Sequence, residues 1–234
     1  MLSIAAALFA ATSVVAPAAG NALTLPAARH LVRIDPGDGA PAAWLLAVQQ
    51  DGEAGHGLVF YRSDDEARTF HYYAPIQNDW SERSTADLVA VDRDVAVVWS
   101  YESWELGGSD RHDVWFQWWR YSAGDFRPQP AVRVFDSTSA SSAYSRALIA
   151  RDSRDRLWIQ AFRLESDGGS TAVISVSEDG GATWRQQAPL DRLSHRGGGR
   201  LIGAGSKLLF FYSSHGCCPE GRLRVRNNGD DVGL

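Results

Sequence analysis

The chain has 234 residues, which suits a single all-β unit or one domain of moderate size. Hydrophobic residues make up 44% and charged residues 22%, a globular composition that excludes a disordered chain. The net charge is −5 and no basic block stands out, so we expect no nucleic-acid partner.

The first segment, residues 2–19, is an uncharged apolar run rich in alanine, with small residues around Ala16 to Gly20. This is typical of the apolar region of a signal peptide with an A-x-A-like cleavage site, although the basic n-region is missing. An uncleaved anchor is the alternative, because the run is about long enough to span a bilayer. Its alanine and serine content favours export. We therefore predict that residues 1–20 are a signal segment, that the protein is secreted or periplasmic, and that no membrane insertion follows removal of this segment.

Beyond this segment, pairs of apolar runs recur with a period of about 55 residues. In each pair a short strand, a tight polar turn and a second strand follow one another. The pairs cover residues 31–35 and 43–48, 88–92 and 95–100, 148–152 and 157–162, and 201–205 and 207–212. Two further strands complete each module, which predicts an all-β fold built as a β-propeller of four-stranded blades. A β-sandwich is the alternative, but it needs no fixed period.

An octet of the pattern S-x-D-x-G-x-T-W connects the third and fourth strands of a module. The clearest copy is Ser177–Trp184. A less complete copy is Ser63–Phe70, which has Ala67 and Phe70 in place of the glycine and the tryptophan. Degenerate copies are predicted around 115–126 and 223–231. The aspartate can accept hydrogen bonds from its own turn, the glycine can adopt a positive φ, and the aromatic residue can plug the hairpin from below. The structural positions are Ser63, Asp65, Thr69 and Phe70 in the less complete copy, and Ser177, Asp179, Gly181, Thr183 and Trp184 in the clear one. These local tasks favour a hairpin staple over a ligand site.

This pattern resembles the Asp-box, or BNR repeat, of sialidase-like β-propellers. The resemblance implies six blades, whereas four are visible, so residues 21–234 are interpreted as a propeller that is incomplete at the C-terminus. A complete four-bladed propeller is the alternative. The resemblance further implies a glycan or glycoconjugate partner, a monomer and no cofactor.

Up-and-down strand order places the octets and the tight turns on one face and the longer loops on the other, where a ligand site is expected. Three arginines lie at or near the start of inner strands: Arg29, Arg146 and Arg200. Three guanidinium groups converging on a channel would suit a carboxylate ligand, because a guanidinium can bind a carboxylate through two parallel hydrogen bonds. The richest loop is 101–113, which adds Trp104 and His112 as candidate substrate-binding residues.

The resemblance implies a retaining sialidase mechanism with a tyrosine nucleophile, an assisting glutamate and an acid/base aspartate. The candidates here are Tyr101, Glu102, and Asp79 or Asp87. The family's R-I-P motif is matched only by Arg33-Ile34-Asp35, which lacks the proline. Two hypotheses follow: a secreted exo-sialidase-like glycoside hydrolase, and a non-catalytic propeller that binds glycan or protein. A Vps10-like or assembly-factor-like scaffold is a third.

No metal site is expected. Adjacent Cys217 and Cys218 with His215 supply three ligands, one short of a structural zinc set.

Overall fold

The computed structural model describes eight stretches of the chain: 28–37, 39–50, 57–77, 84–101, 112–137, 143–193, 197–214 and 221–227. The proposed signal segment, both cysteines and His215 lie outside them. Strands dominate the described residues, which contain no α-helix.

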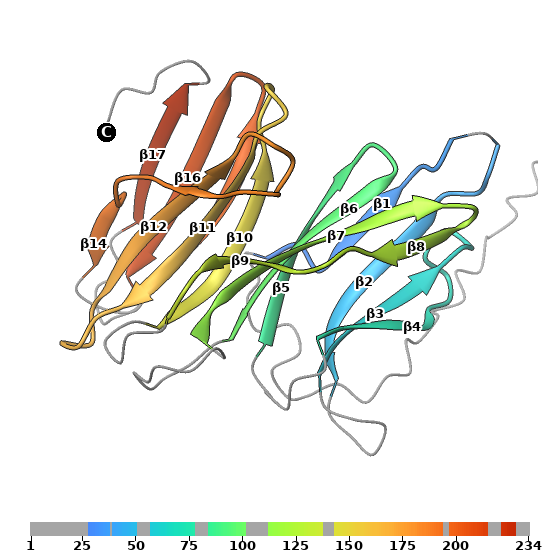
Figure 1. Cartoon of the computed structure of the whole chain (residues 1–234), viewed down its shortest axis with the longest axis horizontal. Coiled ribbons are helices and arrows are strands. Elements are labelled where there is room, and N and C mark those ends of the chain that lie inside the picture. Colours follow the sequence, from blue (N-terminus) through green and yellow to red (C-terminus); the bar gives the residue numbers. More distant parts are fainter. Residues whose placement is uncertain are drawn as a thin grey trace, which may run out of the picture.

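Four antiparallel sheets follow one another along the chain (Figure 1). Sheet I contains β1 (Leu31–Ile34), β2 (Ala43–Gln50), β3 (Gly57–Ser63) and β4 (His71–Gln77). Sheet II contains β5 (Ser84–Val91), β6 (Asp94–Tyr101), β7 (Val114–Ser122), β8 (Asp125–Pro128) and β9 (Val132–Phe135). Sheet III contains β10 (Tyr144–Arg151), β11 (Leu157–Leu164), β12 (Ser170–Ser177), β13 (Arg185–Gln186) and β14 (Asp191–Leu193). Sheet IV contains β15 (Gly197–Ala204), β16 (Lys207–Ser214) and β17 (Gly221–Asn227).

Each sheet begins with its innermost strand and continues outward strand by strand. The inner strands β1, β5, β10 and β15 pack in this order, and the sheets lie along an arc with sheets I and IV at its two ends (Figure 1). In sheets II and III two short strands share the outer edge: β8 and β9 both pair with β7, and β13 and β14 both pair with β12. The four sheets are blades of a β-propeller, as the repeat predicted.

The core consists of apolar layers between successive sheets. In β11, Ile159 packs toward sheet II, whereas Trp158 and Phe162 pack toward sheet IV. Alternate residues of a strand point to opposite faces, and here both faces are covered. Double burial therefore explains why this strand reads as a nearly continuous apolar run rather than as a polar–apolar alternation.

The Ser177–Trp184 octet folds into a turn held by its own side chains. Asp179 accepts hydrogen bonds from the Thr183 amide (2.9 Å) and the Ser177 hydroxyl (2.8 Å), and the Ser177 hydroxyl accepts one from the Gly181 amide (2.7 Å). The Trp184 ring then packs edge-on against Phe116 of sheet II, with 5.2 Å between ring centroids. The octet therefore closes a hairpin and contacts the neighbouring sheet.

The Ser63–Phe70 octet adopts the same geometry without glycine. Asp65 accepts hydrogen bonds from the Thr69 amide (2.9 Å) and the Thr69 hydroxyl (2.6 Å). Glu66 and Ala67 have φ of 59° and 60°, in the places where the other octet has Gly180 and Gly181. The side-chain network therefore holds a left-handed backbone even where the residues disfavour it.

The degenerate octet predicted at 115–126 is wrong. These residues form β7 and β8, joined by the two-residue turn Ala123-Gly124 with φ of 52° and 87°. Two positive φ angles are typical of a type I′ hairpin, whose twist matches that of the strands, so no longer turn is needed. Of the copy predicted at 223–231, residues 223–227 belong to β17, and the rest lies outside the described residues.

Replacing Gly181 with alanine should destabilise the fold much more than replacing Gly180. Both glycines have a positive φ, but an added Cβ at Gly181 would lie 2.2 Å from the Phe116 ring, while nothing lies within 4 Å of one at Gly180. We expect Gly180→Ala to cost about 1–2 kcal/mol from the backbone alone, and Gly181→Ala to cost roughly 1–3 kcal/mol more from overpacking. Urea unfolding of both variants measures the difference, and equal losses would show that the Phe116 contact is irrelevant.

The carboxyl group of Asp179 should titrate below the normal range. The hydrogen bond from the Thr183 hydroxyl, followed by those from the Thr183 amide and Ser177, lowers the pKa of Asp179 to about 2. Because this pKa lies below the ordinary value of 3.8, the contribution of the octet to stability is complete above about pH 4 and is lost as the pH falls through 2.

Thr183→Val should therefore raise the pKa of Asp179 toward its ordinary value, as followed by carbon NMR of the carboxyl groups. Thr69→Val is the matched control, since it changes the other octet and should leave Asp179 unaffected. An unaltered pKa of Asp179 in Thr183→Val would contradict the assigned cause.

Candidate functional site

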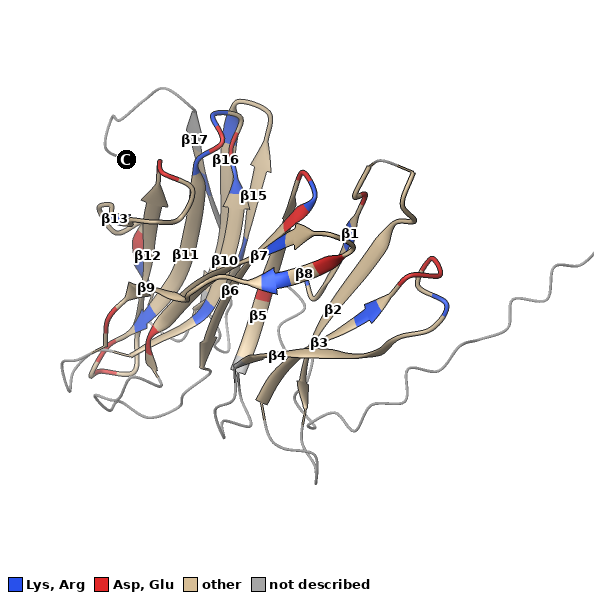
Figure 2. Cartoon of the chain, turned by 45° about the vertical axis from the view of Figure 1, so that its right-hand side comes forward, with Lys and Arg blue, Asp and Glu red and all other residues tan. Residues whose placement is uncertain are grey.

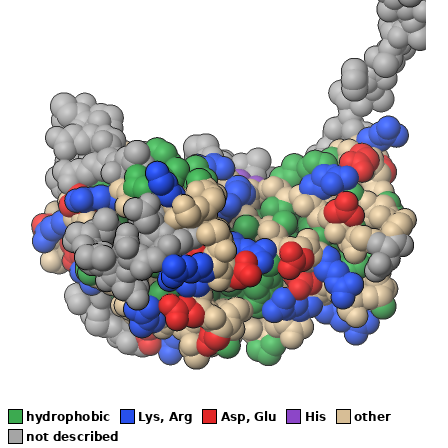
Figure 3. All heavy atoms as spheres, turned by 90° about the horizontal axis from the view of Figure 1, so that it is seen from above, with side chains coloured by type: hydrophobic (Ala, Val, Ile, Leu, Met, Phe, Trp, Pro, Cys, Tyr) green, Lys and Arg blue, Asp and Glu red, His purple; other side chains and the backbone are tan. Residues whose placement is uncertain are grey.

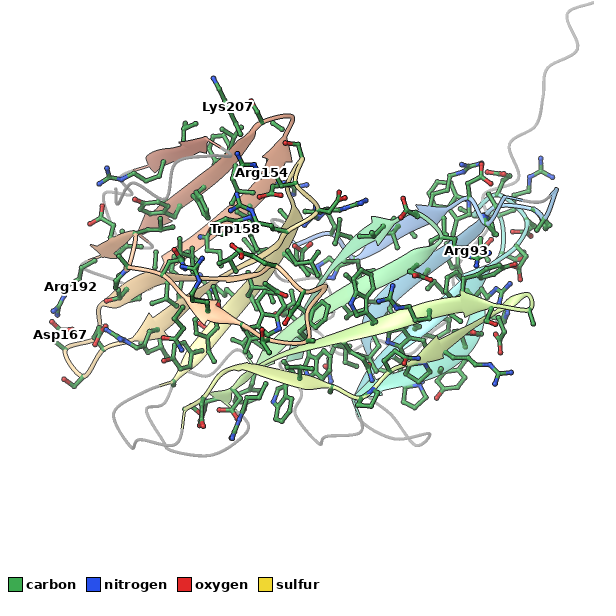
Figure 4. All side chains as sticks on the ribbon, turned by 45° about the horizontal axis from the view of Figure 1, so that its top comes forward. Arg93, Arg154, Trp158, Asp167, Arg192 and Lys207 are labelled. Carbon is green, nitrogen blue, oxygen red and sulfur yellow. The ribbon has the colours of Figure 1, made fainter. Side chains whose placement is uncertain are left out.

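The propeller has two different faces. The octets and tight turns lie on one, which we call the turn face, and the connections at the opposite strand ends form the loop face. Figure 4 shows Arg154 and Lys207 near the turn face and Asp167 and Arg192 at the loop end of sheet III.

Residues of both charge signs lie close together on the turn face (Figures 2 and 3), and several of them form ion pairs. Arg120 contacts Asp94 at 2.7 Å, and the Asp152 carboxylate lies 2.8 Å from both the Arg156 guanidinium and the Trp158 indole nitrogen. Because each of these charges already has a partner in its own turn or in the adjacent strand, the pairs offer little to a ligand.

Buried polar side chains gather at the loop face instead. Those at loop-face strand ends and in the adjoining loops are Gln49, Gln50, Thr85, Ser100, His112, Asp113, Ser137, Ser145, Arg146, Ser170 and Thr171. At the turn face of the described residues, the buried polar side chains are Ser63, Asp152 and Ser177, each bonded within its own turn. Burying a polar group costs free energy unless the group is hydrogen-bonded. The concentration of buried polar side chains at the loop face therefore makes this face the candidate functional site.

Arg146 occupies a strained position in this region. It lies in a bulge of β10, between Ser145 and Leu148, and has a φ of 55°. Its side chain is 7% exposed, and Nη1 donates a hydrogen bond to the Gly197 carbonyl at 2.8 Å. Bulges redirect side chains, and strained residues cluster at functional sites, so Arg146 is the strongest of the predicted ligand-binding residues.

Arg29 and Asp87 bind each other. Asp87 is 1% exposed and accepts hydrogen bonds from the Arg29 amide (2.6 Å), Nε (3.0 Å) and Nη2 (2.7 Å), and from the Ile149 amide (2.8 Å). The Arg29 guanidinium also donates to the Ile149 carbonyl. The four donors occupy the Asp87 carboxylate, and the Arg29 guanidinium is engaged by the same carboxylate and by the Ile149 carbonyl. The geometry therefore favours a structural role for both residues.

The structure does not bring the three arginines together. Arg200 alternates along β15 with Leu201, which packs toward sheet III, so the Arg200 side chain projects from the opposite face of sheet IV. Arg146 reaches toward sheet IV, and Arg29 is bound to Asp87.

Of the other predicted residues, Tyr101 and His112 lie together. Their rings meet edge-on with centroids 5.6 Å apart, and His112 is 8% exposed. Asp79, Glu102 and Trp104 lie outside the described residues.

A further loop-face cluster has no counterpart in the sequence prediction. Tyr144 pairs with Arg163 across β10 and β11, and Arg163 contacts Glu165 at 3.1 Å. Burial raises the pKa of Tyr144, opposed by the Arg163 guanidinium and its hydrogen bond. The register of the two strands is the signal that could have revealed this pair.

Within the described residues, no group of three or more His, Cys, Asp or Glu side chains could hold a metal ion, and no helix is long and apolar enough to cross a membrane.

No protein-family model and no curated protein matches the sequence. Solved structures match its fold. An ulvan lyase of polysaccharide lyase family PL25, bound to a GlcA–Rha3S oligosaccharide, has 13% identity and a TM-score of 0.57, covering 85% of this chain and 52% of that one. Trypanosoma rangeli sialidase in complex with the inhibitor DANA has 13% identity and a TM-score of 0.57, and the match covers 86% of this chain and 36% of the sialidase. The Hadza microbial sialidase Hz136 has 12% identity and a TM-score of 0.52, covering 84% and 44%.

The chain has the fold of these propellers. It spans about half the length of the lyase and less than half of the two sialidases.

Asp87→Asn should destabilise the protein strongly. The change replaces a charged carboxylate that accepts hydrogen bonds from the Arg29 and Ile149 amides with a neutral amide. It also leaves the Arg29 charge without its partner. We expect a loss of about 2–4 kcal/mol, somewhat below the range for a fully buried pair because the Arg29 side chain is 29% exposed. Asp167→Asn breaks the exposed pair with Arg192 and should cost less than about 0.5 kcal/mol. Chemical denaturation of both variants gives the comparison, and similar small losses would refute the role assigned to Asp87.

Proposed function

We propose that the protein binds glycans at its loop face. The observation that carries this proposal is the concentration of buried polar side chains there, together with the strained Arg146. Sugar hydroxyls need several converging hydrogen-bonding groups held on a rigid scaffold, and strand ends provide them. Proteins of the same fold support the proposal, since one is bound to an oligosaccharide and another to sialic acid.

In its specific form the proposal is a secreted or periplasmic sialidase-like glycoside hydrolase that acts on terminal acidic sugars of glycoconjugates. Arg146 would bind the sugar carboxylate, because a guanidinium forms paired charge-assisted hydrogen bonds with it. Tyr101 with Glu102, and Asp79, are the candidates for nucleophile, assisting base and acid. The hydrogen bonding within both octets, centred on Asp65 and Asp179, supports the Asp-box resemblance on which this form rests.

A non-catalytic glycan-binding propeller is the second candidate. It is favoured by the mutual binding of Arg29 and Asp87, which removes one arginine and one acid from catalysis.

Arg146→Ala should reduce turnover of a fluorogenic sialoside. Losing hydrogen bonds to a charged group costs about 1.5–3 kcal/mol, which corresponds to a fall of roughly 10- to 150-fold in kcat/KM. Arg185→Ala, at an exposed position on outer strand β13 next to a turn-face octet, is the control and should leave turnover unchanged. Thermal unfolding checks that both variants are folded.

A binding measurement with the same variants distinguishes the enzyme from the non-catalytic propeller. Binding of sialyllactose that depends on Arg146, without turnover, would support the non-catalytic form. If the protein showed no turnover of the sialoside and no glycan binding, the proposal would be overturned.

A further inference from the structure

The backbone at Arg146 needs support from outside its own strand. The bulge places Arg146 and Ala147 of β10 opposite the single residue Ala161 of β11. Among the described residues, the other non-glycine residues with a positive φ lie in turns or bends, whereas Arg146 lies inside a strand. A left-handed residue in a strand persists only where the surrounding structure fixes it. The groups that fix this one are therefore part of what the bulge does.

Ser100 of β6 holds the bulge from sheet II. Its hydroxyl accepts a hydrogen bond from the Ala147 amide at 3.0 Å, and the side chain is 1% exposed. Ala147 directly follows Arg146, so this bond fixes the backbone at the point where the chain leaves the left-handed residue.

Ser170 of β12 holds the acceptor of the Arg146 side chain. The Gly197 amide donates a hydrogen bond to the Ser170 hydroxyl at 2.8 Å, while the Gly197 carbonyl accepts one from Arg146 Nη1 at 2.8 Å. Ser170 is fully buried, and the Phe162 ring lies against the α-carbon of Gly197, where an added Cβ would be 2.3 Å away. Ser170 therefore sets the position of the carbonyl that orients the guanidinium.

Buried serines elsewhere in the described chain make similar bonds with a purely local effect. The Ser177 hydroxyl accepts a hydrogen bond from the Gly181 amide at 2.7 Å, is 1% exposed and stabilises its own octet on the turn face. What sets Ser100 and Ser170 apart is the residue at the other end of each bond, which either follows Arg146 or binds its guanidinium.

We propose that Ser100 and Ser170 are positioning residues, which hold the Arg146 guanidinium in the orientation that binds a carboxylate ligand at the loop face. The inference rests on the proposed function, to which it adds two residues that touch no ligand. A guanidinium has five N–H donors in a planar fork, and the bond to Gly197 uses Nη1. Bidentate binding of a carboxylate needs two parallel donors, so it depends on the angle of this plane. Groups that lock that angle contribute to affinity without contacting the ligand.

The affinity of the full chain for sialyllactose, measured by NMR titration into the millimolar range, tests the proposal. Ser100→Ala and Ser170→Ala should each weaken binding by about 3- to 10-fold, which is the effect of losing one hydrogen bond. Ser177→Ala removes a bond of the same kind on the turn face and should change the affinity by less than about twofold. Thermal unfolding checks that each variant is folded, and either of the two positioning variants suffices if the other does not fold.

The same substitutions in an Arg146→Ala background separate positioning from stability. With no guanidinium to orient, Ser100→Ala and Ser170→Ala should change the remaining affinity by less than about twofold. Equal weakening in both backgrounds would show a structural role only and would refute the positioning role. The same conclusion would follow if Arg146→Ala weakened binding and neither serine substitution did. If the unmodified protein bound no sialyllactose, the proposed function would fail, and the positioning role would fail with it.

Discussion

The propeller depends on one buried carboxylate that joins three sheets. The innermost strand of each sheet is an edge strand, whose free N–H and C=O groups need partners where the blades converge. Asp87 of sheet II accepts hydrogen bonds from the amides of Arg29, ahead of β1, and Ile149 of β10, and the Arg29 guanidinium returns a hydrogen bond to the Ile149 carbonyl. The Leu88 amide adds a bond of 3.0 Å to the Arg29 carbonyl. These bonds connect the segment ahead of β1 with the inner strands of sheets II and III.

This constraint also limits the chemistry of the site. An interior ion pair contributes little net stability, because desolvation offsets much of its attraction, but removing one partner leaves an unpaired charge at a high cost. Arg29 is one of the three arginines predicted to bind a carboxylate and Asp87 is one of the two candidate acids, and in the structure they bind each other. Ligand chemistry therefore falls to residues outside the Arg29–Asp87 pair, such as Arg146, and to the loops beside it.

The sequence predicted what is local and periodic. The apolar runs gave the strands of four sheets, and the pattern around Asp179 and Gly181 predicted a turn whose hydrogen bonds the structure contains. The prediction at 115–126 was wrong because a two-residue turn and a longer one can follow similar strands. The pairing of Arg29 with Asp87, 58 positions apart, depends on how adjacent sheets are inclined, and no local pattern encodes that angle. The bulge at Arg146 was missed because it is visible only in the register of β10 against β11, which the local sequence does not reveal.

Arg146 and Gly197 illustrate how junction and site overlap. A Cβ at Gly197 would lie 2.3 Å from the Phe162 ring, so only glycine allows β15 to approach sheet III this closely. That approach brings the Gly197 carbonyl within 2.8 Å of the Arg146 guanidinium. A non-glycine residue at a φ of 55° costs about 1–2 kcal/mol, a cost that the contact with Gly197 helps to offset. The same bulge that lets Arg146 join sheets III and IV also places a cation at the loop-face start of an inner strand. Structural anchoring and ligand binding at this position are therefore compatible, and substitutions there are expected to affect both.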